Sequence, residues 1–208
     1  MPQLAGDASP GSFPGEPALA ALVECARAGE DAAFAALFEH YNARIFRYLE
    51  RIVGNPEVGR DLTQDTFVAA WRSLPGLQEA GRFSPWLYRI ATNMARLHLR
   101  RARLIRWLPW GAPEQPIAGA HLSLVDPEEQ IGQSEWVRLA LATLTPKYRI
   151  CLLLQLEGGF SQREIAHLLD LAEKSVSSYI SRGRQQFRLA YQRLEDESYP
   201  PTKGARTP

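Results

Sequence analysis

A run of arginines without acidic residues stands out between Ala80 and Pro113. This segment contains seven arginines and no aspartate or glutamate. Five of its polar residues recur at intervals of four, three, four and three: Arg89, Asn93, Arg96, Arg100 and Arg103. That spacing places them on one face of a helix. Because no carboxylate of the segment neutralises this stripe, a phosphate backbone is its expected counter-charge. The alternative is an ordinary solvated helix face.

A second set of hydrogen-bond donors lies near the C-terminus. Ser161-Gln162-Arg163-Glu164 has the pattern of a capping box that begins a short helix. A break over 170–172 then precedes a longer helix, and small Ala166 lies where the two must approach, so we expect a helix-turn-helix. Its second helix presents outward Ser177, Ser178, Ser181, Arg182, Arg184, Gln185 and Arg188. These side chains suit the major groove and its flanking phosphates; the alternative is a plain helical hairpin.

Hydrophobic periodicity predicts that helices position both sets, because no strand pattern is present. The fold class we expect is all-α, with two small helical domains joined by a flexible linker. Ser84 looks like an N-cap followed by Pro85 at the first helical position. The expected buried residues of the N-terminal half include Phe34, Leu37, Phe38, Tyr41, Ile45, Leu49, Ile52, Val58, Leu62, Phe67, Trp71, Leu87, Ile90, Met94 and Leu97.

The charge pattern indicates two basic units with an acidic tether. Residues 31–107 and residues 138–194 each carry a formal charge of +5, whereas residues 113–137 hold five acids and no base. We therefore expect separately mobile units over 17–107 and 134–195. The segment 108–133 is then an acidic, Pro/Gly-rich linker, and 1–16 and 196–208 are disordered tails.

Several classes of protein do not fit the sequence. No apolar run approaches the roughly 20 residues of a membrane span, and no secretory signal precedes the first helix. Cys25 and Cys151 are interpreted as reduced thiols of a cytosolic protein, with a redox switch as the alternative. The four histidines lack metal-ligand spacing, and no phosphate-binding glycine loop or catalytic triad is visible. We expect neither an enzyme nor a metal ion or cofactor.

Taken together, these residues resemble the extracytoplasmic-function (ECF) group of bacterial sigma factors, which belong to the sigma-70 type. Residues 29–107 resemble the second sigma region, through the motifs Gly29–Phe34, Asp61–Phe67 and Trp86–Ala91. Residues 134–194 resemble the fourth region, through Leu144-Thr145-Pro146 and Gly159-Phe160-Ser161. The absence of an intervening third region also fits this group.

The resemblance implies a protein that binds core RNA polymerase, recognises the −35 and −10 promoter elements and assists strand opening. Asp61, Gln64 and Asp65 would dock on the clamp of the largest polymerase subunit, although solvated carboxylates near a helix N-terminus need no partner. The implied −10 contacts are Arg82, Phe83, Trp86, Arg89, Asn93, Arg96 and Arg100, with Phe83 and Trp86 alternatively in the core. The implied −35 contacts, within a helix-turn-helix over 161–182 and just beyond it, are Lys174, Ser175, Ser177, Ser178, Tyr179, Arg182 and Arg184.

Further partners follow from the resemblance. They are the polymerase flap, promoter DNA and, as in many members, an anti-sigma protein wedged between the two units. The protein would be cytoplasmic, associated with the nucleoid and not inserted in a membrane. The alternative function is a helix-turn-helix DNA-binding regulator that does not engage polymerase.

The sequence departs from the family pattern in the helix-turn-helix. Asp170 stands where the family usually has glycine, and Ala172 where it has serine. Losing that N-cap hydroxyl costs about 1 kcal/mol, which Glu173 partly offsets at the helix start. Ser177 and Tyr179 stand where lysine and arginine are frequent. We therefore expect weaker or different recognition of the −35 element.

Overall fold

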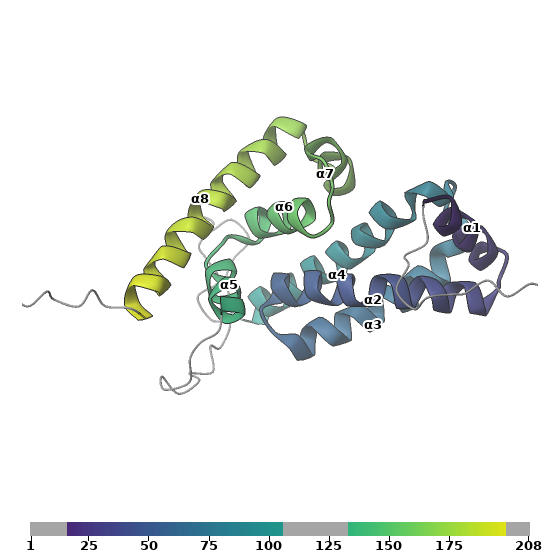
Figure 1. The fold of residues 1–208 in the computed structure, drawn as a ribbon, viewed down its shortest axis with the longest axis horizontal. Coiled ribbons are helices and arrows are strands. Elements are labelled where there is room, and N and C mark those ends of the chain that lie inside the picture. Colours follow the sequence, from purple (N-terminus) through teal and green to yellow (C-terminus); the bar gives the residue numbers. More distant parts are fainter. Residues whose placement is uncertain (1–15, 106–132, 199–208) are drawn as a thin grey trace, which may run out of the picture.

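The computed structural model describes residues 16–105 and 133–198, and within these ranges the chain is all-α, which confirms the expected fold class (Figure 1). Most of the expected tails and of the expected linker fall outside the described residues, but Glu16, Gln133 and residues 196–198 lie in helices. Arg103 lies in a described helix, but its side chain is outside the description. We call residues 16–105 the N-terminal unit and residues 133–198 the C-terminal unit.

The N-terminal unit consists of four α-helices and two short 3₁₀ turns. They are α1 (Glu16–Arg27), α2 (Asp31–Val53), α3 (Pro56–Ser73), η1 (Leu74–Gly76), η2 (Ala80–Arg82) and α4 (Phe83–Ile105). Gly54 ends α2 in the left-handed conformation, with a φ of 75°, which glycine adopts without steric cost. Asn55 then begins α3, since its side-chain oxygen accepts hydrogen bonds from the N–H groups of Glu57 and Val58 at 2.8 and 3.0 Å.

Close packing of α2, α3 and α4 builds the platform behind the arginine stripe. A Cβ atom at Gly59 would lie 2.9 Å from the Cα atom of Glu50, so a glycine is what lets α3 lie against α2. Between α2 and α4, the Tyr48 hydroxyl lies 2.7 Å from Thr92 Oγ1, and Thr92 donates to the carbonyl oxygen of Tyr88. The buried hydroxyls of Tyr48 and Thr92 are therefore both hydrogen-bonded.

The structure corrects several expectations about this unit. Trp71 and Phe38 are 38% and 37% exposed, and Leu97 is 41% exposed. Leu97 is displaced from the core because the buried face of α4 is formed by Leu87, Tyr88, Ala91, Thr92 and Ala95. Ser84 is not an N-cap: the turn η2 leads directly into α4, which already includes Phe83.

The C-terminal unit contains the expected helix-turn-helix. Its elements are α5 (Gln133–Ala142), α6 (Pro146–Leu156), α7 (Gln162–Leu169) and α8 (Glu173–Ser198). The capping box is confirmed: Ser161 Oγ accepts from the Glu164 N–H at 3.3 Å, and the Glu164 carboxylate accepts from the Ser161 N–H at 2.8 Å. Asp170 ends α7 with a φ of 55°, the left-handed conformation that glycine would adopt more easily.

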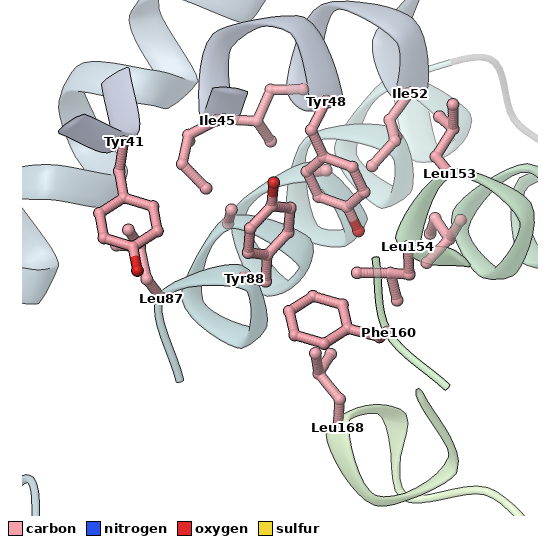
Figure 2. Packing of buried hydrophobic residues seen from close by; sticks show 14 of the residues in the cluster. Tyr41, Ile45, Tyr48, Ile52, Leu87, Tyr88, Leu153, Leu154, Phe160 and Leu168 are labelled. Atoms are coloured by element: carbon pink, nitrogen blue, oxygen red, sulfur yellow. The ribbon is translucent and has the colours of Figure 1, made fainter. Parts of the chain in front are cut away.

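The two units pack against each other and share one apolar core (Figures 1 and 2). Phe160, from the turn between α6 and α7, reaches the N-terminal unit, and its ring centroid lies 5.1 Å from that of Tyr88. Gly158 makes room for that ring, since a Cβ atom there would lie 2.6 Å from it. The expectation that the units move independently stays a prediction; in this structure they are in contact.

Arginines reinforce this junction with polar contacts. Arg149 donates to the carbonyl oxygens of Ile52, Ala142 and Leu144 at 2.7, 2.8 and 3.0 Å. Arg138 donates to the carbonyl oxygen of Gly54 at 3.2 Å. The C-terminal unit therefore supplies donors for carbonyl groups at the end of α2 that the helix itself leaves unpaired.

Candidate nucleic-acid interface

The arginine stripe lies on the solvent side of α4. Arg89, Asn93, Arg96 and Arg100 are all exposed, and the opposite face of the helix is buried against α2 and α3. The arrangement is a rigid cationic ridge, because a helix fixed by its apolar face holds its polar face in place. Such a surface fits phosphates at intervals along a nucleic-acid strand.

The residues that precede the stripe divide between surface and core. Phe83 is 1% exposed and packs between Tyr41 and Trp86, with ring centroids 5.4 and 5.7 Å away. This burial removes Phe83 from the candidate base contacts, because a ring inside the core offers no face to a base. Trp86 is half-buried, and Arg82 is exposed and paired with Glu79 at 2.7 Å.

The candidate −35 residues occupy the first half of α8. Lys174, Ser177, Arg182 and Arg184 are exposed, and Ser175, Ser178 and Tyr179 are half-buried. Val176 and Ile180 are buried on the opposite side, so the helix is anchored as a recognition helix requires.

Two arginines of this set also contact α6. Arg182 donates to the hydroxyl of Tyr148 at 3.3 Å, and Arg184 donates to Gln155 Oε1 at 2.7 Å. Tyr179 packs on the ring of Tyr148, with centroids 5.5 Å apart. Arg184 is thus turned towards α6.

A mixed acidic and apolar face runs along α3. Asp61, Gln64 and Asp65 are exposed, as the docking expectation requires. Val68 and Trp71 follow at helical spacing and are 43% and 38% exposed. Sequence reasoning missed this apolar end because it assigned Trp71 to the core; the signal was the continuation of the exposed 61/64/65 spacing to 68 and 71.

A groove between α6 and α8 was also missed from the sequence. It has a volume of about 550 Å³ and is lined by Leu152, Leu156, Arg184, Phe187, Arg188, Tyr191, Gln192 and Glu195. Leu156 is 64% exposed. Only the position of α6 relative to α8 shows that the helix pair leaves an apolar channel around the half-buried Phe187.

The cysteines show no sign of activated thiols. Burial raises the pKa of Cys151 to about 11. The charge of Glu30 raises the pKa of Cys25, with burial and a hydrogen bond to Glu30 adding to the shift. Both thiols are thus less reactive than a free cysteine, because the thiolate is the reactive form.

Neither a metal-ligand cluster nor a membrane-spanning helix is found among the described residues. In the ranges 16–105 and 133–198, no group of histidine, cysteine and carboxylate side chains is arranged to hold a metal ion. No helix in the same part of the chain combines the length and apolar character needed to cross a membrane.

Comparison with known proteins decides the family. Residues 37–105 match the model of sigma-70 region 2, and residues 134–187 match that of sigma-70 region 4. The ECF RNA polymerase sigma-E factor of Haemophilus influenzae is 32% identical over 173 residues, covering 79% of this chain and 90% of that protein. The chain belongs to the ECF sigma factor family. It is therefore an RNA polymerase-directing sigma factor.

Other relatives agree with this assignment. The ECF sigma factor SigE of Mycolicibacterium smegmatis is 33% identical to this sigma factor, over 73% of the chain and 59% of that relative. SigW of Bacillus subtilis is 27% identical, over 77% of this chain and 89% of the relative.

Solved structures show the same fold. CnrH, determined in complex with the cytosolic domain of CnrY, superposes with a TM-score of 0.59 at 26% identity. The match covers 87% of this sigma factor and 99% of CnrH. The sigma factor RpoE from Bartonella quintana, in complex with the anti-sigma factor NepR, gives a TM-score of 0.59 at 20% identity.

Proposed function

We propose that this sigma factor binds core RNA polymerase through α3, contacts the −10 element through α4 and contacts the −35 element through α8. The observation that carries the proposal is the exposure of Arg89, Asn93, Arg96 and Arg100 on one unit together with an anchored recognition helix on the other. One polypeptide thus offers two separate cationic surfaces, as recognition of two promoter elements requires.

At the −10 element, the stripe supports phosphate contacts along one strand. Arg96 and Arg100 lie on α4 beyond Arg89 and follow the helix axis. The loop over 74–82 and the half-buried Trp86 are the proposed neighbours of unstacked bases. Aromatic and cationic groups together favour single-stranded nucleic acid, because bases stack on rings while phosphates pair with arginine.

The polymerase contacts are proposed on two surfaces. Asp61, Gln64 and Asp65 form the acidic part of the clamp-docking face, and the exposed Val68 and Trp71 extend it. Exposed aromatic side chains are typical of interface centres, and polar and charged ones are typical of the surrounding rim. The flap is proposed to enter the groove between α6 and α8, whose apolar lining fits a hydrophobic segment.

Promoter binding requires the two units to separate. The −35 and −10 elements are about 25 base pairs apart, which is roughly 85 Å of duplex. In this structure α4 contacts α7, and only residues 170–172 separate α7 from α8. With the units in contact, the DNA-binding surfaces on α4 and α8 are too close together to reach both promoter elements at once. We therefore propose that polymerase binding opens the junction. An anti-sigma partner would act by preventing that opening.

The decisive experiment is reconstituted transcription. The purified chain and core polymerase are incubated with native genomic DNA, and initiation sites are mapped. We expect initiation at a defined set of promoters that share two spaced elements. Repression, or no effect on core polymerase, would instead favour a DNA-binding regulator.

Nucleotide turnover by the isolated chain would contradict the proposal that this protein is not an enzyme. Microscopy of a labelled chain tests its proposed cytoplasmic, nucleoid-associated location.

A further inference from the structure

A polar hollow, here called the junction notch, opens between α2 and the turn that joins α6 to α7. It has a volume of about 550 Å³ and is lined by Arg44, Arg47, Arg51, Leu156, Glu157, Gly158 and Gly159. Ligand sites of proteins typically measure about 300–1,000 Å³. Because one wall comes from each unit, a ligand bound there touches both.

The wall formed by α2 is strongly cationic. Arg44, Arg47 and Arg51 recur at helical spacing, so they share one face of the helix. Glu157, which comes from the opposite wall, is the one carboxylate among the lining residues, and it forms an ion pair with Arg51. The lining thus carries a formal charge of +2. A concave, cationic surface concentrates anions, because its low-dielectric walls focus the field.

The same charges act on a buried group at the junction. Burial, with a smaller contribution from the charge of Glu157, raises the pKa of Tyr88 to about 12, and Arg44 and Arg47 oppose the shift. These three charged side chains, which line the notch, therefore all lie near enough to Tyr88 to act on it electrostatically.

The opposite wall leaves space for a ligand to approach the backbone. Gly159 has a φ of +71°, and a Cβ atom built there would meet nothing within 4 Å. Gly158 cannot carry a side chain, because its Cβ atom would collide with the Phe160 ring. Arginine forks facing a glycine turn are a combination that proteins use to bind phosphate groups.

We propose that the junction notch binds a small compound with several linked phosphates, of the class of nucleoside polyphosphates or inorganic polyphosphates. A duplex is too wide to enter the hollow, whose volume suits a small molecule. Leu156 is the one apolar side chain in the lining, so the notch lacks the hydrophobic anchors that a protein partner requires.

Such a ligand would hold the two units together. Since it contacts arginines of one unit and the glycine turn of the other, it binds the closed arrangement better than an opened one and shifts the population towards it. This consequence rests on the proposed function, in which polymerase binding opens the junction.

The test is calorimetric titration of the full chain with inorganic tripolyphosphate at constant ionic strength. We expect binding that weakens at least tenfold in the double variant Arg44→Gln, Arg47→Gln. The matched control is Arg60→Gln, Arg72→Gln, which removes the same charge from exposed positions of α3; its affinity should stay within twofold of the unchanged chain. Tripolyphosphate should also weaken binding to core polymerase for the unchanged chain but not for the first variant.

Four results would overturn the proposal. They are no binding up to about 1 mM tripolyphosphate, equal weakening in both double variants, tighter binding of a glutamate-rich peptide at the notch, and tighter binding of a short DNA duplex there. The last two would assign the notch to a protein partner or to promoter DNA. Because calorimetry uses the isolated chain, the proposed site and the proposed function can fail separately. A chain that binds tripolyphosphate but never binds core polymerase would contradict the proposed function and would leave the proposed phosphate site unaffected.

Discussion

The guanidinium of Arg149 donates to the carbonyl oxygen of Ile52 at 2.7 Å, which joins residues 97 positions apart in the sequence. The same side chain donates to the carbonyl oxygens of Ala142, the last residue of α5, and of Leu144, two residues beyond it. Burial lowers the pKa of Arg149 to about 10, so the group remains charged at neutral pH. A positive charge at the C-terminal ends of two helices is favourable because those ends carry partial negative charge.

Replacing Arg149 with methionine should destabilise the junction. The change leaves the three carbonyl oxygens without this donor, and each unsatisfied buried group costs about 1–3 kcal/mol. We expect the free energy of unfolding to fall by about 3 kcal/mol in urea titrations. Arg163→Met, at an exposed position of α7, is the matched control and should change stability by less than about 0.5 kcal/mol. Equal effects of the two changes would contradict the assigned role.

Val68→Lys should weaken binding to core polymerase. Val68 is 43% exposed, so its replacement costs little folding energy, but it places a charge in the apolar end of the proposed docking face. We expect at least about a tenfold loss of affinity in a fluorescence titration with core polymerase. Ala43→Lys, at an exposed position of α2, should bind normally. Unchanged affinity of Val68→Lys, with a loss in Asp65→Asn, would restrict the interface to its acidic end.

Arg96→Ala and Arg100→Ala should reduce both the affinity of the holoenzyme for promoter DNA and its dependence on salt. Each lost phosphate contact to a single strand lowers the slope of log affinity against log salt by about 0.7. The measurement is promoter binding over a series of salt concentrations. Slopes that do not change in either variant would remove these two arginines from the phosphate contacts.

Gly59→Ala should destabilise the N-terminal unit. The added Cβ atom would lie 2.9 Å from the Cα atom of Glu50, and the backbone there cannot yield as a flexible side chain would. Overpacking of this kind costs about 1–3 kcal/mol. Gly76→Ala is the control, since a Cβ atom there meets nothing within 4 Å. Thermal unfolding should separate the two variants, and similar melting temperatures would show that α2 and α3 can move apart at little cost.

Stability should fall above about pH 10. Burial raises the pKa of Tyr48 and raises that of Tyr88 to about 12, so the folded chain retains protons that the unfolded chain releases. This contribution is fully present below pH 10 and is lost as the pH rises through about 12. Arg149, whose pKa is lowered, acts in the opposite direction in the same range but is a single group.

Urea titrations from about pH 9 to pH 11 measure this dependence, and the ultraviolet absorbance of tyrosinate reports which rings ionise. We expect ionisation of Tyr48 and Tyr88 to coincide with unfolding. Tyr88→Phe should reduce the pH dependence, because it removes one of the shifted groups. Ionisation of all tyrosines at their ordinary pKa in the folded chain would contradict the burial of these two rings.

Much of the local structure could be predicted. The capping box at Ser161 depends on residues within one turn, so the sequence pattern was sufficient to place it. The exposure of Arg89, Asn93 and Arg96 followed from their spacing, because charged side chains rarely enter a core. The prediction was wrong for Trp71 and Leu97. The helix period indicates which residues share a face, but it does not indicate how much of that face the neighbouring helices cover.

The sequence by itself determined the helices, the family and the positions of the two cationic surfaces, because these depend on near neighbours and on motif spacing. Tertiary structure alone decided that Phe160 packs on Tyr88, that Arg149 reaches Ile52, and that Arg44, Arg47 and Arg51 face Glu157 across a notch. Such contacts join residues that are far apart in the sequence: 72 positions for Phe160 and Tyr88, and 97 for Arg149 and Ile52. Their formation depends on how two complete units fit together, which no local pattern of residues records.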